Sequence, residues 1–262
     1  MKPRALKALT LGPGGRTAVL LMALACSHAN ASPTADTHDD APQTPTTPLL
    51  HAAPTKQVLI EAYGDSTTLG ISCSAGHCSP RPQNAVTYLQ DALRSVYGER
   101  VSVVNLGVGG TMAWQLRDGT DRGHGVPWQQ QLAASDAQIV TINYGINEVM
   151  RNQTPEQFYA AETALVKTAL ALGKEPVLQT SNPMPDGRLN ARLAAMVAMT
   201  RRVAAEQHVP IVDQYAYISG LPDWQSMMSD GAHPKPELYR LKAGQDLRVV
   251  DPLVRRLLAG SS

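Results

Sequence analysis

The chain has 262 residues, of which 43% are hydrophobic, and this is enough apolar material to bury the core of one sizeable domain. Its formal net charge is +1, but residues 1–31 contain four basic side chains and no acid, so the remainder carries a net charge of −3. A chain this close to neutral lacks the basic surplus typical of nucleic-acid-binding proteins, and no nucleic acid is expected among its partners.

The N-terminal segment has the organisation of a secretory signal. Its basic stretch is followed by an apolar run at residues 18–25 and then by Ala29-Asn30-Ala31, a small-x-small cleavage site. We therefore predict a signal peptide over residues 1–31 and an exported protein, periplasmic or secreted. No segment approaches the roughly 20 apolar residues that a transmembrane helix requires, so no membrane span is expected. Anchoring as a lipoprotein through Cys26 is disfavoured, because Ala23 stands where such sites usually have leucine.

The next segment, residues 32–56, is rich in proline and threonine and is predicted to be a disordered linker, followed by a folded domain over residues 57–262. In that domain, apolar runs typical of strands occupy residues 58–63, 101–106, 139–143, 176–179 and 209–212. Apolar residues at helical spacing occupy residues 84–97, 155–172 and 189–207, and a last helix is expected within residues 237–258. This alternation predicts an α/β sandwich with a five-stranded parallel sheet, whose sites lie at the carboxyl ends of the strands.

Cleavage after Ala31 leaves Cys73 and Cys78 as the two cysteines of the mature chain. An even pair in an oxidising compartment predicts a disulfide that closes a small loop. One alternative is a zinc site that uses Cys73, His77 and Cys78, although no second pair of ligands has matching spacing. The other is a pair of free thiols. We expect neither a metal nor a cofactor.

A serine follows the first predicted strand directly, in Gly64-Asp65-Ser66-Thr67. At a strand's carboxyl end, where a helix begins, its hydroxyl would be exposed and its backbone N–H would face an incoming anionic oxygen. The alternative is a plain helix cap, a position that Ser and Asp both favour.

A base for this serine is offered by Asp230-Gly231-Ala232-His233-Pro234, which precedes the last predicted helix. A nucleophilic serine needs a base, and a histidine needs an orienting partner on its other nitrogen. The three-residue spacing lets Asp230 hold His233 directly within one tight turn. Of the other histidines in the predicted domain, His124 in Gly123-His124-Gly125 is a weaker second candidate.

Two further polar loops follow the second and third predicted strands: Asn105-Leu106-Gly107-Val108-Gly109-Gly110-Thr111 and Asn143-Tyr144-Gly145-Ile146-Asn147-Glu148. Together with the serine loop they could offer a developing oxyanion the backbone N–H groups of Ser66 and Gly110 and the side-chain amide of Asn147. Read separately, each loop is equally an ordinary turn, where Gly and Asn are the usual residues.

These four blocks, in this order from Gly64 to His233, resemble the SGNH (GDSL-like) hydrolases. The resemblance implies Ser66 as nucleophile, His233 as base, Asp230 as its partner, and Gly110 and Asn147 as oxyanion donors. It also implies a three-layer, flavodoxin-like sandwich and the hydrolysis of carboxylic esters.

One residue departs from the family's pattern. The third block commonly reads Gly-x-Asn-Asp, whereas this chain has Glu148 after Asn147. This puts in doubt any hydrogen bond by which the shorter aspartate shapes the loop. A dinucleotide site and the Gly-x-Ser-x-Gly elbow are both excluded, because Met112 and Thr68 occupy the positions where each motif needs its last glycine.

The expected activity is therefore that of an exported serine esterase acting on short acyl groups, with an acetylated carbohydrate or small-molecule ester as substrate. An O-acetyltransferase for an exported polysaccharide uses the same acyl-enzyme and stays open, as does a secreted binding module without catalysis. Trp114 and Trp224 could form a sugar-stacking wall, and Met227 and Met228 an acyl pocket, although core packing is the simpler interpretation of each.

Overall fold

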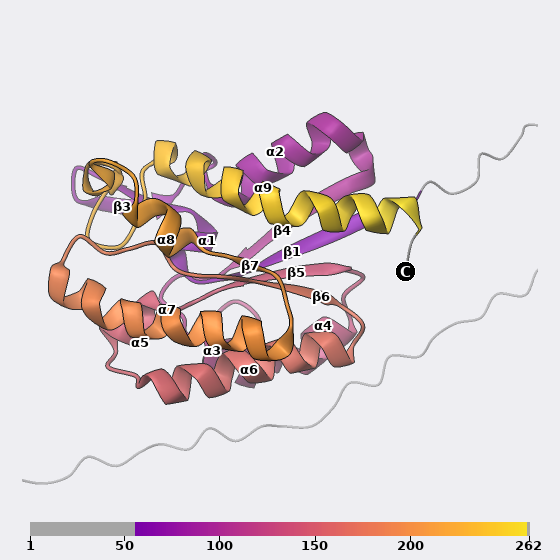
Figure 1. Ribbon diagram of the computed structural model, residues 1–262, viewed down its shortest axis with the longest axis horizontal. Coiled ribbons are helices and arrows are strands. Elements are labelled where there is room, and N and C mark those ends of the chain that lie inside the picture. Colours follow the sequence, from indigo (N-terminus) through magenta and orange to yellow (C-terminus); the bar gives the residue numbers. More distant parts are fainter. Residues whose placement is uncertain (1–55, 261–262) are drawn as a thin grey trace, which may run out of the picture. The chain divides into compact units, whose positions relative to one another are not determined.

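The computed structural model describes residues 56–260 (Figure 1). The predicted signal peptide, Cys26 and all of the predicted linker except Lys56 lie outside the described residues, so these assignments stay predictions. Within residues 56–260, no helix combines the length and the apolar character needed to cross a membrane.

The centre of the domain is a sheet of five parallel strands in the order β4-β1-β5-β6-β7. The strands are β1 (Val58–Gly64), β4 (Val101–Gly107), β5 (Ile139–Asn143), β6 (Glu175–Gln179) and β7 (Ile211–Val212). Numbered by their sequence within the sheet, this order is 2-1-3-4-5, as in flavodoxin. The predicted parallel sheet is confirmed, with a last strand of only two residues.

Helices cover both faces of the sheet (Figure 1). The long helices are α2 (Ala85–Tyr97) and α9 (Pro236–Ala259) on one face, and α6 (Pro155–Ala171) and α7 (Gly187–Gln207) on the other. Alternate strand residues belong to separate buried clusters: Ile60 and Ile139 pack with the α2 and α9 side, whereas Tyr63 and Ile142 pack with the α6 and α7 side. This two-sided burial produces the three layers that were predicted.

Several short elements were not predicted. They are α1 (Ser66–Leu69), α3 (Ala113–Asp118), α4 (Trp128–Ala133), α5 (Ile146–Met150), α8 (Gln214–Ser219) and the antiparallel hairpin of β2 (Ile71–Ser74) and β3 (His77–Pro80). Helices of four to six residues span less than two turns, so they carry too little periodicity to be recognised. Two single 3-10 turns, Gly98–Arg100 and Trp224–Met227, complete the described elements.

The hairpin is closed by the Cys73–Cys78 disulfide, as expected from the sequence. The two cysteines are direct cross-strand partners, with their Cα atoms 4.0 Å apart. Ala75 and Gly76 form the tight turn, and both have positive φ angles. With the sulfurs bonded to each other, no thiolate remains for the alternative zinc site, and His77 is exposed on β3.

The order of the strands determines where the polar loops meet. β1 lies between β4 and β5, so the segments that follow these three strands emerge side by side at one edge of the sheet. In a doubly wound sheet this edge, at the point where the strand order reverses, is where ligands bind.

Candidate active site

Ser66 is the first residue of α1, and Asp65 caps that helix. The buried Asp65 carboxylate accepts hydrogen bonds from the Thr67 backbone N–H at 2.8 Å and the Thr67 hydroxyl at 2.9 Å. Burial raises the pKa of Asp65 above its usual value. The preceding Gly64 is required by space, because a Cβ there would lie 2.2 Å from Thr68 Oγ1. The cap therefore exists but uses Asp65, which leaves the Ser66 side chain free for other contacts.

A continuous chain of hydrogen bonds joins Ser66, His233 and Asp230. Ser66 Oγ lies 2.8 Å from His233 Nε2, and His233 Nδ1 lies 2.8 Å from Asp230 Oδ2. The other Asp230 oxygen accepts backbone N–H groups of Ala232 at 2.8 Å and His233 at 2.6 Å, which fixes the turn. Burial favours a higher Asp230 pKa, but these hydrogen bonds and the His233 ring outweigh it and lower that pKa. The structure thus brings the three predicted residues together.

The disulfide hairpin braces the loop that carries Asp230 and His233. The Cys73 N–H donates to Ser229 Oγ at 2.9 Å, and the Ser229 hydroxyl donates to the His233 carbonyl at 2.9 Å. Cys73 Sγ also lies 3.0 Å from Asp230 Oδ2. At the base of the hairpin, the Tyr239 hydroxyl of α9 donates to the Ile71 carbonyl at 2.7 Å. The hairpin was not predicted from the sequence, so its hydrogen bonds to the loop of Asp230 and His233 were not predicted either.

The three predicted oxyanion donors lie at the same edge. The Asn147 side-chain amide donates to the Thr111 carbonyl at 3.0 Å and to Asp65 Oδ2 at 3.2 Å, so it links the loops after β4 and β1. The backbone N–H groups of Ser66 and Gly110 have no acceptor among the described residues. An oxyanion could therefore use two free N–H groups directly, and would compete with Asp65 for one hydrogen of Asn147.

The profile of the GDSL-like Lipase/Acylhydrolase family matches residues 62–241, which include all three loops and the Asp230 to His233 turn. The chain belongs to this family of carboxylic ester hydrolases. No curated protein matches the chain.

Two solved hydrolase structures share the fold. An acetylxylan esterase from Geobacillus stearothermophilus, Axe2, is 20% identical with a TM-score of 0.59, over 75% of this chain and 95% of that one. LAE5, an alpha/beta hydrolase enzyme from the metagenome of Lake Arreo, Spain, is 20% identical with a TM-score of 0.60, over 74% of this chain and 95% of that one. At such low identity, the likeness concerns the fold.

Glu148, which replaces the aspartate common in this family, is fully buried and makes two backbone contacts. Its Oε1 accepts the Ala113 N–H at 2.8 Å and its Oε2 accepts the Gly145 N–H at 2.9 Å. The longer side chain thus ties the start of α3 to the turn that presents Asn147. Burial, reinforced by the Asp65 charge and opposed by hydrogen bonds from backbone N–H groups, raises the Glu148 pKa to about 7. The doubt raised by this substitution is resolved, because the loop keeps a carboxylate anchor.

A buried polar network behind the Asp230 to His233 turn was also missed. Lys242 Nζ donates to Asn182 Oδ1 at 3.3 Å, and Asn182 Nδ2 donates to the Ala232 carbonyl at 3.1 Å. Asp246, one turn further along α9, accepts side-chain amides of Gln179 and Gln214, each at 2.7 Å. Burial lowers the Lys242 pKa and raises that of Asp246. The signal in the sequence was a lysine and an aspartate, four apart, on the apolar face of the last helix.

The second histidine candidate lies in a separate pair. His124 Nδ1 is 2.9 Å from Asp121 Oδ2, and Asp121 is buried. This pair has the same three-residue spacing as Asp230 and His233, so spacing alone does not distinguish the two histidines. It is His233, however, whose ring reaches Ser66.

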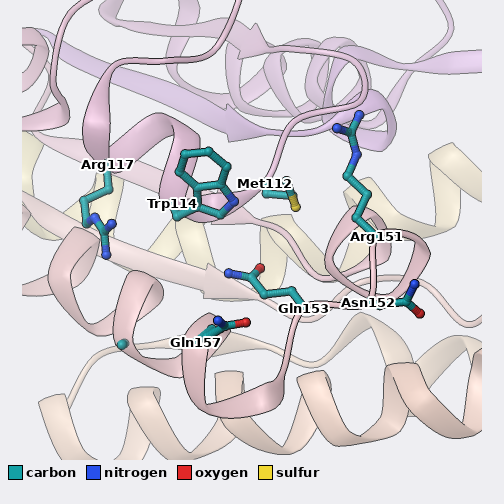
Figure 2. A pocket seen from close by; sticks show the side chains of 8 residues that line it. Met112, Trp114, Arg117, Arg151, Asn152, Gln153 and Gln157 are labelled. Carbon is teal, nitrogen blue, oxygen red and sulfur yellow. The ribbon is translucent and has the colours of Figure 1, made fainter.

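The two tryptophans named from the sequence have different surroundings. Trp224 is buried in a small cluster with Met228, and Met227 packs against that cluster, so core packing is the correct interpretation for these three. Trp114 is half-buried and lines a pocket of about 490 Å³ together with Met112 and Arg151 (Figure 2).

Proposed function

We propose that this chain is a serine esterase that removes short acyl groups from carbohydrate or small-molecule esters, with Ser66, His233 and Asp230 as its triad. The observation that carries the proposal is the unbroken path from Ser66 Oγ through both ring nitrogens of His233 to the Asp230 carboxylate, with 2.8 Å at each step.

The reaction would proceed through an acyl-enzyme. Ser66 Oγ attacks the ester carbonyl carbon while its proton passes to His233 Nε2, and Asp230 stabilises the imidazolium that forms. The carbonyl oxygen becomes an oxyanion held by the Ser66 and Gly110 N–H groups and by Asn147. Collapse of this intermediate breaks the bond to the alcohol, which leaves with the proton from His233. Water then attacks the acyl-enzyme by the same route and releases the acid.

Three observations support the proposed triad, the short acyl group and the sugar. Structures described as catalytic mutants of Axe2 replace a serine, an aspartate and a histidine, with the aspartate three residues before the histidine, as in Asp230 and His233 here. Axe2 is described as an acetylxylan esterase, so acetate on a carbohydrate is the preferred ester for this chain. The pocket beside Trp114 is lined by polar side chains and suits a hydroxylated alcohol portion better than a long acyl chain.

The test is hydrolysis of p-nitrophenyl esters from acetate to palmitate by residues 32–262, beside Ser66→Ala. We expect rates that fall with acyl length and are lost in the variant. Equal rates in both proteins would overturn the assignment of Ser66. If acetate is instead transferred to an added sugar acceptor faster than to water, the chain is an acetyltransferase that uses the same site.

We also propose export, which rests on the pattern of residues 1–31 and is supported by the Cys73–Cys78 disulfide, since such bonds persist in oxidising compartments. Expression of the full chain in a bacterial host, followed by N-terminal peptide mass spectrometry, should find Ser32 as the first residue. An intact or lipid-modified N-terminus would contradict cleavage after Ala31.

A further inference from the structure

A pocket of about 490 Å³ adjoins the loop that carries Gly110 (Figure 2). Its lining combines an aromatic ring, side-chain amides and two guanidinium groups, from Met112, Trp114, Arg117, Arg151, Gln153 and Gln157. Of the described residues that line it, none is acidic. This volume and composition fit a small hydroxylated ligand that carries negative charge.

Arg151 connects this pocket to Ser66. Its Nη2 donates to the Gly110 carbonyl at 3.0 Å, so the guanidinium lies against the loop that offers the Gly110 N–H. On the same loop, a Cβ added to Gly109 would lie 3.8 Å from Ser66 Cβ. A substrate whose ester carbon is at Ser66 can therefore extend its alcohol portion past Gly110 to Arg151.

The two arginines of the pocket differ in what neutralises them. The Arg117 guanidinium forms a bidentate ion pair with its neighbour Asp118. Its Nε lies 2.7 Å from Asp118 Oδ1 and its Nη2 lies 2.9 Å from Asp118 Oδ2. Arg151 forms no ion pair within residues 56–260. The Gly110 carbonyl is the one acceptor there to which the Arg151 side chain donates a hydrogen bond. Because a guanidinium has five N–H donors in a planar fork, Arg151 has several left for a carboxylate.

The remaining lining suits a sugar ring. Trp114 and Met112 lie between the two arginines, and the amides of Gln153 and Gln157 lie below them in Figure 2. Trp114 is half-buried, so a face is available for an apolar sugar surface. Gln153 also lines the pocket, and its side-chain amide is of the kind that binds sugar hydroxyls.

We propose that this pocket binds the alcohol portion of an acetylated acidic carbohydrate, and that Arg151 determines specificity by pairing with the sugar's carboxylate. The proposal rests on the esterase function and adds a substrate class to it. Acetate on a uronic acid, rather than on a neutral sugar, is the substrate that the pocket favours.

The test compares two matched substrates, the tri-O-acetylated methyl β-xyloside and methyl β-glucuronide, which differ only in the carboxylate on C5. We expect kcat/KM for acetate release to be about fivefold higher for the glucuronide, a factor in keeping with a partly exposed ion pair. The preference should fall to about one in Arg151→Gln, be partly kept in Arg151→Lys, and shrink in 0.5 M salt because exposed charges are screened.

The control is Arg202→Gln, because Arg202 lies on α7 outside the pocket and pairs with Glu206. It should keep the wild-type preference. An unchanged ratio in Arg151→Gln, or a wild-type preference for the xyloside, would overturn the proposal. p-Nitrophenyl acetate separates the two levels: if its hydrolysis depends on Ser66 while the ratio does not depend on Arg151, only the proposed specificity fails.

Discussion

Glu148 provides a direct test of how burial shapes this site. The carboxyl is fully buried, and its pKa is raised from 4.5 to about 7. Between pH 4.5 and about pH 7, the folded chain therefore keeps a proton on Glu148 that the unfolded chain has already lost. The resulting stability is full below about pH 4.5 and is lost as the pH rises through 7. Glu148→Gln removes this titration and should flatten that part of the pH profile.

The magnitude follows from the two pKa values. Between pH 5 and pH 8, the shift from 4.5 to about 7 costs the wild-type protein about 2 to 3 kcal/mol of unfolding free energy that the variant does not lose. The variant also loses a fixed amount of unfolding free energy at every pH. Its NH2 group replaces one of the two carboxylate oxygens and cannot accept the Ala113 or Gly145 N–H that this oxygen accepted. The offset shifts the whole curve and leaves its slope unaffected.

Urea unfolding followed by tryptophan fluorescence at pH 5, 6, 7 and 8 measures this difference. The matched control is Glu99→Gln, because the Glu99 side chain is 85% exposed. The curve of this variant should run parallel to that of the wild-type protein. Parallel curves for the wild-type protein and Glu148→Gln would show that the Glu148 pKa is not raised by burial. In the same variant kcat should fall more than KM rises, because the lost contact holds the turn that presents Asn147.

Three further predictions concern the site. Asp230→Asn keeps the side chain's size but not its charge, so kcat should fall by roughly 10²- to 10⁴-fold with KM little changed, and a fall below threefold would contradict the orienting role. Asn147→Ala should lower kcat by about 10²- to 10³-fold if it donates to the oxyanion, whereas a change confined to KM would remove it from that role. Replacing Cys73 and Cys78 by serine should cost about 2 kcal/mol of stability, measured by urea unfolding, for a loop this short. It should also lower kcat, because the hairpin supports the Asp230 turn, and full activity in a destabilised variant would show that this support is not needed.

The fold could be predicted because its signals are long. The four long helices extend over enough residues for their period to appear, and the strands of the sheet stand out as continuous apolar runs. The alternation of these two signals allows few arrangements. The hairpin of β2 and β3 could not be recognised, since its two four-residue strands are largely polar and bury a single residue, Ser72. They are held by the Cys73–Cys78 bond rather than by a core.

The candidate site likewise has residues that the sequence predicts and residues that it does not. Ser66, Asp230 and His233 could be proposed from residue types and spacing, because a triad needs those chemical groups in a fixed relation. The hydrogen bonds of Glu148 to Ala113 and Gly145 depend on how two loops far apart in sequence approach each other, which no local pattern records. The same holds for Arg151, whose contact with Gly110 spans 41 residues.

In the proposed reaction, Ser66 carries the acyl group between the two steps. The most direct measurement is reaction of residues 32–262 with a fluorophosphonate, which captures a serine activated by a neighbouring base, followed by peptide mass spectrometry. We predict one adduct per chain, on Ser66, formed much more slowly in His233→Ala. An adduct on a different serine, or undiminished esterase activity after Ser66 is fully modified, would show that Ser66 is not the nucleophile.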